Sequence, residues 1–150
     1  MLGPAGASGL RVLDIYAGTG GLGIEALQRG AELAVFIEQN ARRCDDIKKA
    51  LERHRLAMQS SVQRGSALHA VGRLKGEFDL IFADPPYDLV EFEALFERVE
   101  EAGLIAPKAI AFLEHSKMTE LPDSLPGLTL STHRLYGDTA VSVYKSSQKL

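Results

Sequence analysis

The stretch DIYAGTGGLG, from Asp14 to Gly23, sets the architecture of this chain. It follows the apolar run LRVLDIY and leads into a segment of helical periodicity that stops at Gly30. A buried strand, a glycine-rich turn and a helix, in that order, are typical of the first unit of a parallel α/β sheet. The glycines at 18, 20 and 23 match G-x-G-x-x-G, a pattern of nucleotide-binding turns.

The alternation of strand-like and helix-like segments continues through most of the chain. Apolar runs predict strands over Leu10–Tyr16, Leu33–Glu38, Ser61–Arg64, Phe78–Ala83 and Ala109–Glu114. Apolar residues at helical spacing predict helices over Leu22–Arg29, Ala41–Arg55, a segment capped by Ser66 that ends at Leu74, and Glu91–Ala102. The tail predicts a hairpin of Leu128–Tyr136 and Thr139–Tyr144, joined by Gly137-Asp138. We therefore expect a doubly wound, Rossmann-like α/β sheet, mostly parallel, with an antiparallel C-terminal hairpin.

Length and composition fit one ordinary globular domain. The chain has 150 residues, of which 45% are hydrophobic and 25% charged. We expect a flexible segment over residues 1–9 and one domain over residues 10–150. The sequence contains no apolar run of about 20 residues and no signal-type N-terminus. Its single cysteine, Cys44, cannot form an internal disulfide, so we expect a cytoplasmic, monomeric protein that does not contact membranes.

The net charge of -3 excludes a polycation, but the basic residues are unevenly placed. They concentrate in the middle third of the chain: Arg42, Arg43, Lys48, Lys49, Arg53, Arg55, Arg64, Arg73 and Lys75. A solvated helix face accounts for this pattern. The alternative is a surface that contacts phosphates.

The glycine pattern alone is weak evidence for a ligand, and the residues around it strengthen the indication and limit which ligand fits. We expect Gly18 and Gly20 to face the ligand, because glycine allows close backbone approach, and Gly23 to pack the helix against the strand. Glu38 ends the second strand, where a carboxylate can accept hydrogen bonds from both ribose hydroxyls. This arrangement suits NAD and S-adenosylmethionine equally.

Asp14 distinguishes between those two ligands. NAD would place a pyrophosphate at the turn, and a nearby carboxylate would repel it. S-adenosylmethionine instead carries an ammonium group and a sulfonium, and Asp14 can attract these cations. Asp14 can also accept hydrogen bonds from amides of the turn, and the two roles can coexist.

The stretch ADPPYD follows the fourth predicted strand and predicts the chemistry. Pro85 and Pro86 end the strand as a stiff arm that offers carbonyl acceptors. Asp84 and the Pro85 carbonyl could each accept one hydrogen of an exocyclic base amine, which would free the nitrogen lone pair for a methyl group. Tyr87 could stack on the base, which must be splayed out of its strand. The alternative is a proline-rich turn in which Tyr87 packs as a lid.

These motifs resemble the bacterial 16S ribosomal RNA guanine-N2 methyltransferases of the RsmD type, which are class I enzymes. The matching pieces are VLDIYAGTGGLGIEALQRGA, FIEQN, FDLIFADPPY and RLYGDTAVSVYK, in the order of the family, from Leu10 to Lys145. The resemblance implies an S-adenosylmethionine cofactor and a ribosomal RNA or small-subunit particle as partner. It implies no metal.

The resemblance also assigns residues to the site. It implies that Asp14, Ala17, Gly18 and Gly20 line the methionine end of the cofactor, that Glu38 binds the ribose with Gln39 beside the adenine, and that Asp84, Pro85, Pro86 and Tyr87 handle the guanine amine. Family members often have an acidic residue after the third strand to recognise the adenine amine. This chain has Gly65-Ser66-Ala67 there, so Ser66, Ala67 or their backbone groups would serve. Tyr16 stands where the family commonly has Phe.

Three other functions remain open on the sequence alone. A DNA adenine-N6 methyltransferase shares the DPPY stretch. A truncated domain that binds S-adenosylmethionine without catalysis would fit the short front end, since only nine residues precede Leu10 and the family's basic N-terminal extension is missing. A nicotinamide dehydrogenase fits the glycine pattern, but Asp14 opposes it. The histidines at 54, 69, 115 and 133 lack metal-ligand spacing, so we expect surface or packing roles for them.

Overall fold

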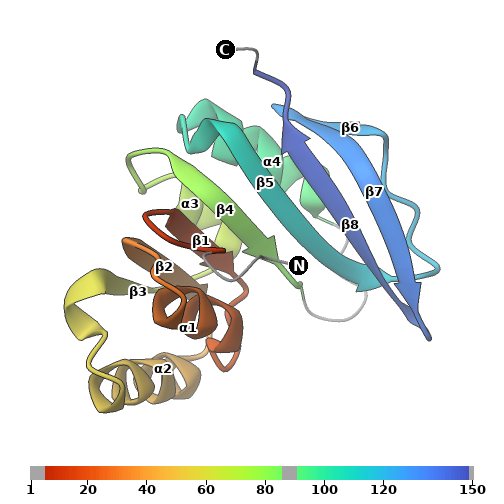
Figure 1. The fold of residues 1–150 in the computed structure, drawn as a ribbon. Coiled ribbons are helices and arrows are strands. Elements are labelled where there is room, and N and C mark those ends of the chain that lie inside the picture. The colour runs from red at the N-terminus through yellow and green to blue at the C-terminus, as the bar shows by residue number, and fades with distance from the viewer. Residues whose placement is uncertain (1–5, 86–90, 149–150) are drawn as a thin grey trace.

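The fold is built on a single eight-stranded sheet, seen in a computed structural model that describes residues 6–85 and 91–148 (Figure 1). The strand order is β3-β2-β1-β4-β5-β8-β7-β6. The strands are β1 Arg11–Ile15, β2 Leu33–Glu38, β3 Ser60–Arg64, β4 Phe78–Ala83, β5 Ile105–Ser116, β6 Ser124–Leu125, β7 Leu128–Tyr136 and β8 Thr139–Ser146. The helices are α1 Gly21–Gln28, α2 Ala41–Arg53, α3 Ala67–Val71 and α4 Phe92–Glu101.

The predicted mixture of parallel and antiparallel strands is confirmed. β1 pairs in parallel with β2 and β4, β2 with β3, and β4 with β5. β8 then runs antiparallel to both β5 and β7. Tyr136 pairs with Thr139, so Gly137 and Asp138 alone form the hairpin turn, and Gly137 has a φ of 62°. The predicted hairpin and its turn are therefore correct.

Helices cover both faces of the parallel part of the sheet (Figure 1). On one face Phe36 and Leu80 pack with Ile47 and Leu51 of α2 and with α1. On the other face lie the apolar sides of α3 and α4, including Phe96. Side chains alternate between the faces along each strand, which explains why these strands are almost continuously apolar in sequence.

The fifth strand is longer than predicted. β5 starts at Ile105 and reaches Ser116, although Pro107 lies within it. The ladder to β4 shifts between Phe78 and Leu80, and this irregularity accommodates a proline that has no N–H for regular pairing. Pairing of β8 along the other edge extends the strand beyond its apolar run.

Other boundaries differ from the prediction by one to three residues, and two of these differences have a clear cause. α3 ends at Val71, with Gly72 as its C-cap, so it stops short of Leu74. β1 ends at Ile15 because Tyr16 has a φ of 61°, which turns the chain out of the strand. β6 is a two-residue strand that the polar sequence around Ser124 did not predict.

Residues 6–9, in the segment expected to be flexible, form a turn against the domain. Ala7 is buried, and the Gly9 N–H donates to the Gly30 carbonyl over 3.0 Å. Within the described part of the chain, no helix has the length and apolar character that crossing a membrane requires.

Candidate functional site

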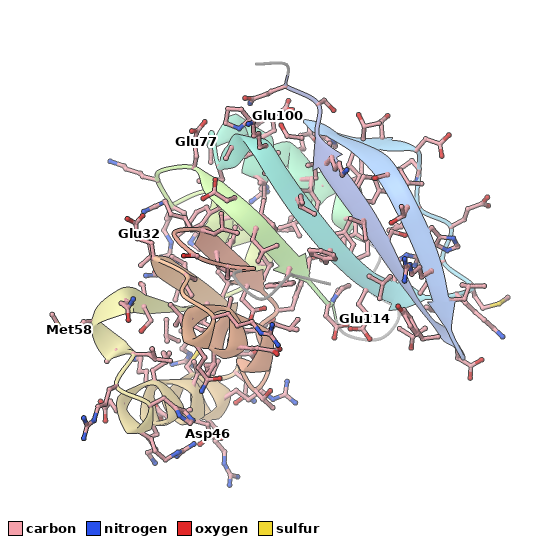
Figure 2. All side chains as sticks on the ribbon, in the orientation of Figure 1. Glu32, Asp46, Met58, Glu77, Glu100 and Glu114 are labelled. Carbon is pink, nitrogen blue, oxygen red and sulfur yellow. The ribbon has the colours of Figure 1, made fainter. Side chains whose placement is uncertain are left out.

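A cavity of about 950 Å³ opens at the carboxyl ends of the parallel strands. In parallel α/β sheets ligands bind at this edge, where the strand order reverses. The turn after β1, the end of β2, the segment after β4 and the end of β5 all contribute to its walls. Figure 2 shows Glu114 at this end of the sheet, opposite the end that carries Glu77 and Glu100.

The register of the sheet places four acidic residues toward one face at this edge. Asp14 pairs with Phe36 of β2 and Phe82 of β4, and Phe82 pairs with Phe112 of β5. Positions two residues apart on a strand share a face. The residues two beyond these phenylalanines are Glu38, Asp84 and Glu114. All four carboxylates line the cavity.

Asp14 is buried and holds the start of α1. Its Oδ2 accepts a hydrogen bond from the Gly23 N–H over 3.1 Å. Only 3% of Asp14 is exposed, and burial, with the charges of Asp84 and Glu38, raises its pKa to about 7 despite the Gly23 bond. Asp14 therefore shapes the turn, and it also lines the cavity. The hydrogen bond from an amide of the turn, one of the two roles considered from the sequence, is confirmed, and the attraction of a cation stays a prediction.

Gly23 has the packing position expected of it. A Cβ there would lie 2.3 Å from a ring carbon of Phe36 and 3.2 Å from Oδ2 of Asp14. Only a residue without a side chain lets α1 approach β2 this closely.

Glu38 holds two backbone segments at once. Its Oε1 accepts from the Gly18 N–H over 2.9 Å, and its Oε2 accepts from the Asn40 N–H over 2.7 Å. Gly18 has a φ of 59°, which favours glycine at this turn. Asn40 in turn caps α2 by accepting from the Arg43 N–H. The carboxylate thus fixes the wall of the cavity in which Ala17 and Gln39 also lie.

Cys44 lies beneath this wall. Its thiol donates to the Glu38 carbonyl over 3.3 Å, and burial raises the pKa of the thiol. Only 3% of Cys44 is exposed. It packs the first turn of α2 against β2 rather than lining the cavity.

Two predicted ligand residues lie away from the cavity among the described residues. Gly20 is not part of the cavity wall, and a Cβ there would lie 3.0 Å from the side chain of Ile47. Ser66 caps α3 by accepting from the His69 N–H, as its sequence context predicted, and is also outside the wall. Ala67, next to Ser66, does line the cavity.

The stretch ADPPYD, predicted to be catalytic, is described only in part. Asp84 and Pro85 leave β4 at the cavity wall. Partial burial, together with the neighbouring carboxyl of Glu114, raises the pKa of Asp84 to about 6. Pro86 and Tyr87 lie outside the described residues, so their predicted roles stay predictions.

The sequence prediction missed Glu114. This residue ends the apolar run AIAFLE, so it occupies the same kind of position as Glu38 and Asp84. The rule that strand carboxyl ends meet at one edge would have identified it.

His115 is buried and so has the packing role that the sequence prediction allowed. It also lines the cavity, which the sequence prediction did not anticipate. Nδ1 of His115 lies 3.0 Å from the Ser116 carbonyl oxygen, and Nε2 lies 2.7 Å from the Ser142 hydroxyl. Its ring also packs on Phe92 and His133. No spacing in the sequence signals this arrangement, because Ser142 and His133 come from the C-terminal hairpin.

Tyr16 completes the wall from the β1 turn. Its hydroxyl donates to Oε2 of Glu91 over 3.1 Å, which ties the turn to the start of α4. A left-handed φ is rare for a bulky residue and marks a constrained position.

The charge of the cavity selects the class of ligand. Five carboxylates and one guanidinium belong to its described lining: Asp14, Glu38, Asp84, Glu114, Asp138 and Arg43. Asp138 is paired with Lys117 over 3.2 Å. An excess of negative charge attracts cationic ligands and repels a pyrophosphate. Among the described residues, no three His, Cys, Asp or Glu side chains are placed so that they could hold a metal ion together.

Comparisons with known proteins give a consistent result. The family model described as "Conserved hypothetical protein 95" matches residues 1–145. A Bacillus subtilis protein named "Putative rRNA methyltransferase YlbH" is 35% identical over 97% of this chain and 80% of its own length. "Ribosomal RNA small subunit methyltransferase D" of Escherichia coli strain K12 is 27% identical over 89% of this chain and 67% of its own length.

The fold comparison agrees. A conserved hypothetical protein of Streptococcus pyogenes superposes with a TM-score of 0.87 at 32% identity, over 93% of this chain and 88% of that one. Other solved structures with this architecture are described as methyltransferases, so the expected class I methyltransferase fold is confirmed.

Proposed function

We propose, from the premise that this chain belongs to the family described as Conserved hypothetical protein 95, that it is an S-adenosylmethionine-dependent ribosomal RNA methyltransferase. We propose further that it methylates the exocyclic N2 amine of a guanine in 16S ribosomal RNA. The observation that carries the proposal is the acidic cavity that joins the glycine turn to Asp84 and Pro85. The names of two relatives support ribosomal RNA as the substrate class.

The cavity fits the proposed cofactor better than it fits a dinucleotide. Asp14 and Glu38 are buried carboxylates on the wall beside Gly18. A pyrophosphate placed there would meet negative charge, whereas an ammonium and a sulfonium would neutralise it. Because the pKa of Asp14 is raised to about 7, a bound cation would also draw this group into its ionised form.

Individual residues have separate tasks in binding. S-adenosylmethionine supplies an electrophilic methyl group. Each carboxylate oxygen has more than one lone pair, so Glu38 can accept from ribose hydroxyls while it keeps its bonds to Gly18 and Asn40. Ala17, Gln39 and Ala67 shape the same wall without adding charge.

Asp84 is the proposed catalytic residue. An exocyclic amine is a poor nucleophile because its lone pair is delocalised into the ring. A carboxylate at Asp84 and the Pro85 carbonyl would each accept one amine hydrogen, which orients the nitrogen and stabilises the positive charge that develops on it. Its raised pKa keeps Asp84 a better proton acceptor than an ordinary aspartate, after methyl transfer has made the amine acidic.

A direct assay tests the proposal. The protein is incubated with methyl-labelled S-adenosylmethionine and small-subunit RNA or particles from a strain that lacks the modification. The RNA is then digested to nucleosides. The expected product is N2-methylguanosine, and a separate digest of the labelled RNA into oligonucleotides locates the modified position. Label in N6-methyladenosine, or label in DNA alone, would contradict the proposed substrate. Tight cofactor binding without transfer to any RNA would support a non-catalytic domain instead.

A further inference from the structure

Glu114 is the one carboxylate of the cavity row to which the proposed chemistry assigns no task. Asp14 and Glu38 are bound to backbone amides, and Asp84 serves the amine. In the described ranges, 6–85 and 91–148, neither Asp84 nor Glu114 forms an ion pair, and the side-chain contact that raises the pKa of Asp84 is with the Glu114 carboxyl itself. Both carboxylates therefore keep acceptor capacity for a ligand.

The sheet places Glu114 beside Asp84. Phe82 and Phe112 are register partners on neighbouring strands, and their rings stack at 5.8 Å between centroids. Asp84 and Glu114 each lie two residues further along, so they emerge toward the same face of the sheet. Both line the cavity. Figure 2 shows Glu114 at the carboxyl end of β5, the edge at which that cavity opens.

The donor pattern of a nucleobase shows what a third acceptor does. The Watson–Crick edge of guanine presents three N–H donors in a row, two on N2 and one on N1. Adenine presents two donors on N6, but its N1 is an acceptor. Asp84 and the Pro85 carbonyl match an exocyclic amine of either base. A further carboxylate next to Asp84 matches the N1–H of guanine and repels the N1 lone pair of adenine.

We propose that Glu114 is the residue that selects guanine, by accepting the N1–H of the target base beside the amine that Asp84 orients. This inference rests on the proposed function, because it needs a base in the cavity. It gives the two neighbouring carboxylates different roles. Asp84 acts on the amine that receives the methyl group, and Glu114 decides which base presents that amine.

The pKa of Asp84 also indicates that the two carboxylates lie close together. The Glu114 carboxyl contributes to the raised pKa of Asp84, after the larger effect of burial. Two like charges at one site weaken each other's ionisation, and donors from a base relieve this repulsion. A base with three adjacent donors relieves more of it than a base with two.

The experiment changes the Watson–Crick edge of the target base. Once the function assay has located the target nucleotide, small-subunit RNA is ligated with guanine or 2-aminopurine at that position and assembled into particles. 2-Aminopurine keeps the amine at C2, but its N1 carries a lone pair in place of the hydrogen and its C6 lacks the oxygen of guanine. The effect of N1 is therefore read from the difference between the wild type and the Glu114 variants. Initial rates are measured for the wild type, Glu114→Gln and Glu114→Asp. Glu32→Gln is the matched control, because this exposed glutamate lies outside the cavity wall.

We expect the wild type and Glu32→Gln to prefer guanine over 2-aminopurine by about 10- to 100-fold or more, because an acceptor that the bound base covers rejects a base that lacks its donor. In Glu114→Gln the preference should fall to within a few-fold of unity, since the amide can donate to N1 of 2-aminopurine. Glu114→Asp should keep the preference at a lower rate. Calorimetry with S-adenosylhomocysteine verifies that each variant is folded and binds the cofactor product.

Each result has one meaning. A wild type that treats the two bases equally, or a Glu114→Gln variant that keeps the full preference, overturns the assignment. A folded Glu114→Gln variant that is inactive on both bases also overturns it, because it would make Glu114 a catalytic rather than a selecting residue. A wild type that methylates no guanine instead contradicts the proposed function, and it is recognised before any variant is compared.

Discussion

Oε1 of Glu38 accepts a hydrogen bond from the Gly18 N–H over 2.9 Å, so the end of β2 fixes the turn that follows β1. The two residues are 20 positions apart in the chain. The same carboxylate binds the Asn40 N–H, so one side chain connects the glycine turn to the start of α2. The first prediction follows from this double attachment.

Replacement of Glu38 by Ala should weaken S-adenosylhomocysteine binding by about 10- to 100-fold, because hydrogen bonds to a charged group contribute about 1.5–3 kcal/mol. The loss combines the proposed ribose contact with a looser turn at Gly18. Isothermal calorimetry measures the affinity, and Glu32→Gln is the control. An affinity within twofold of wild type would show that Glu38 serves the fold alone.

Asp14 should make the stability of the ligand-free protein depend on pH. Its pKa is raised to about 7 in the folded protein from 3.8, so between these values the folded state binds more protons than the unfolded state. The free energy of unfolding should therefore fall as pH rises from about 4 to 7. Asp14→Asn removes the titrating group, and its stability should vary less over this range. Urea unfolding at pH 5, 6, 7 and 8 provides the comparison. Equal slopes for the two proteins would contradict the burial of a titrating Asp14.

The same shift predicts how cofactor binding responds to pH. A cationic ligand favours the carboxylate form of Asp14, so its binding should release a proton below about pH 7. Affinity should increase with pH up to this value and then level. Calorimetry in two buffers of different ionisation enthalpy detects the released proton, and Asp14→Asn should release less. Uptake of protons on binding, instead of release, would exclude a link between cofactor binding and the ionisation of Asp14.

Asp84→Ala should lower the rate of methyl transfer by about 100-fold or more. The affinity for the cofactor should stay within several-fold of the wild-type value. In the wild type, turnover should rise with pH through about 6, because the protonated carboxyl of Asp84 is a weaker acceptor. Glu114→Gln removes a neighbouring negative charge, so the rise in turnover should occur at lower pH in this variant. Single-turnover rates measured between pH 5 and 8 give the pH at which the rate rises. Unchanged turnover in Asp84→Ala would refute the catalytic role.

Gly23→Ala should destabilise the fold by about 1–3 kcal/mol, the usual cost of a methyl group forced into a packed core. The new Cβ would meet the Phe36 ring at 2.3 Å. Gly21→Ala is the matched control in the same helix, since its Cβ would lie 3.6 Å from Thr19 and no positive φ is involved. The control should be neutral or slightly stabilising. Thermal unfolding distinguishes them, and equal melting temperatures would contradict the packing explanation.

Local sequence signals predicted the sheet well because they correspond to local causes. Apolar runs define β1, β2 and β4, and the Gly137-Asp138 pair defines the hairpin turn. Asp14, Glu38 and Asp84 were placed together correctly, since each lies at or near the carboxyl end of an apolar run and the runs are parallel.

The misses have non-local causes. The extension of β5 to Ser116 depends on pairing with β8, which the sequence of β5 does not encode. His115 is held by Ser142 from the hairpin. Gly20 shares the glycine pattern with Gly18, but α2 packs against it, and the pattern alone cannot distinguish a glycine that faces a cavity from one that faces a helix.

The buried Cys44 has a practical consequence. It is the single cysteine of the sequence, and its burial and raised pKa make it slow to react with maleimides in the folded state. Met118 lines the cavity and is 83% exposed. A Met118→Cys variant would therefore carry one fast-reacting thiol, and a fluorophore attached there would report occupancy of the cavity without any further engineering of the wild-type chain.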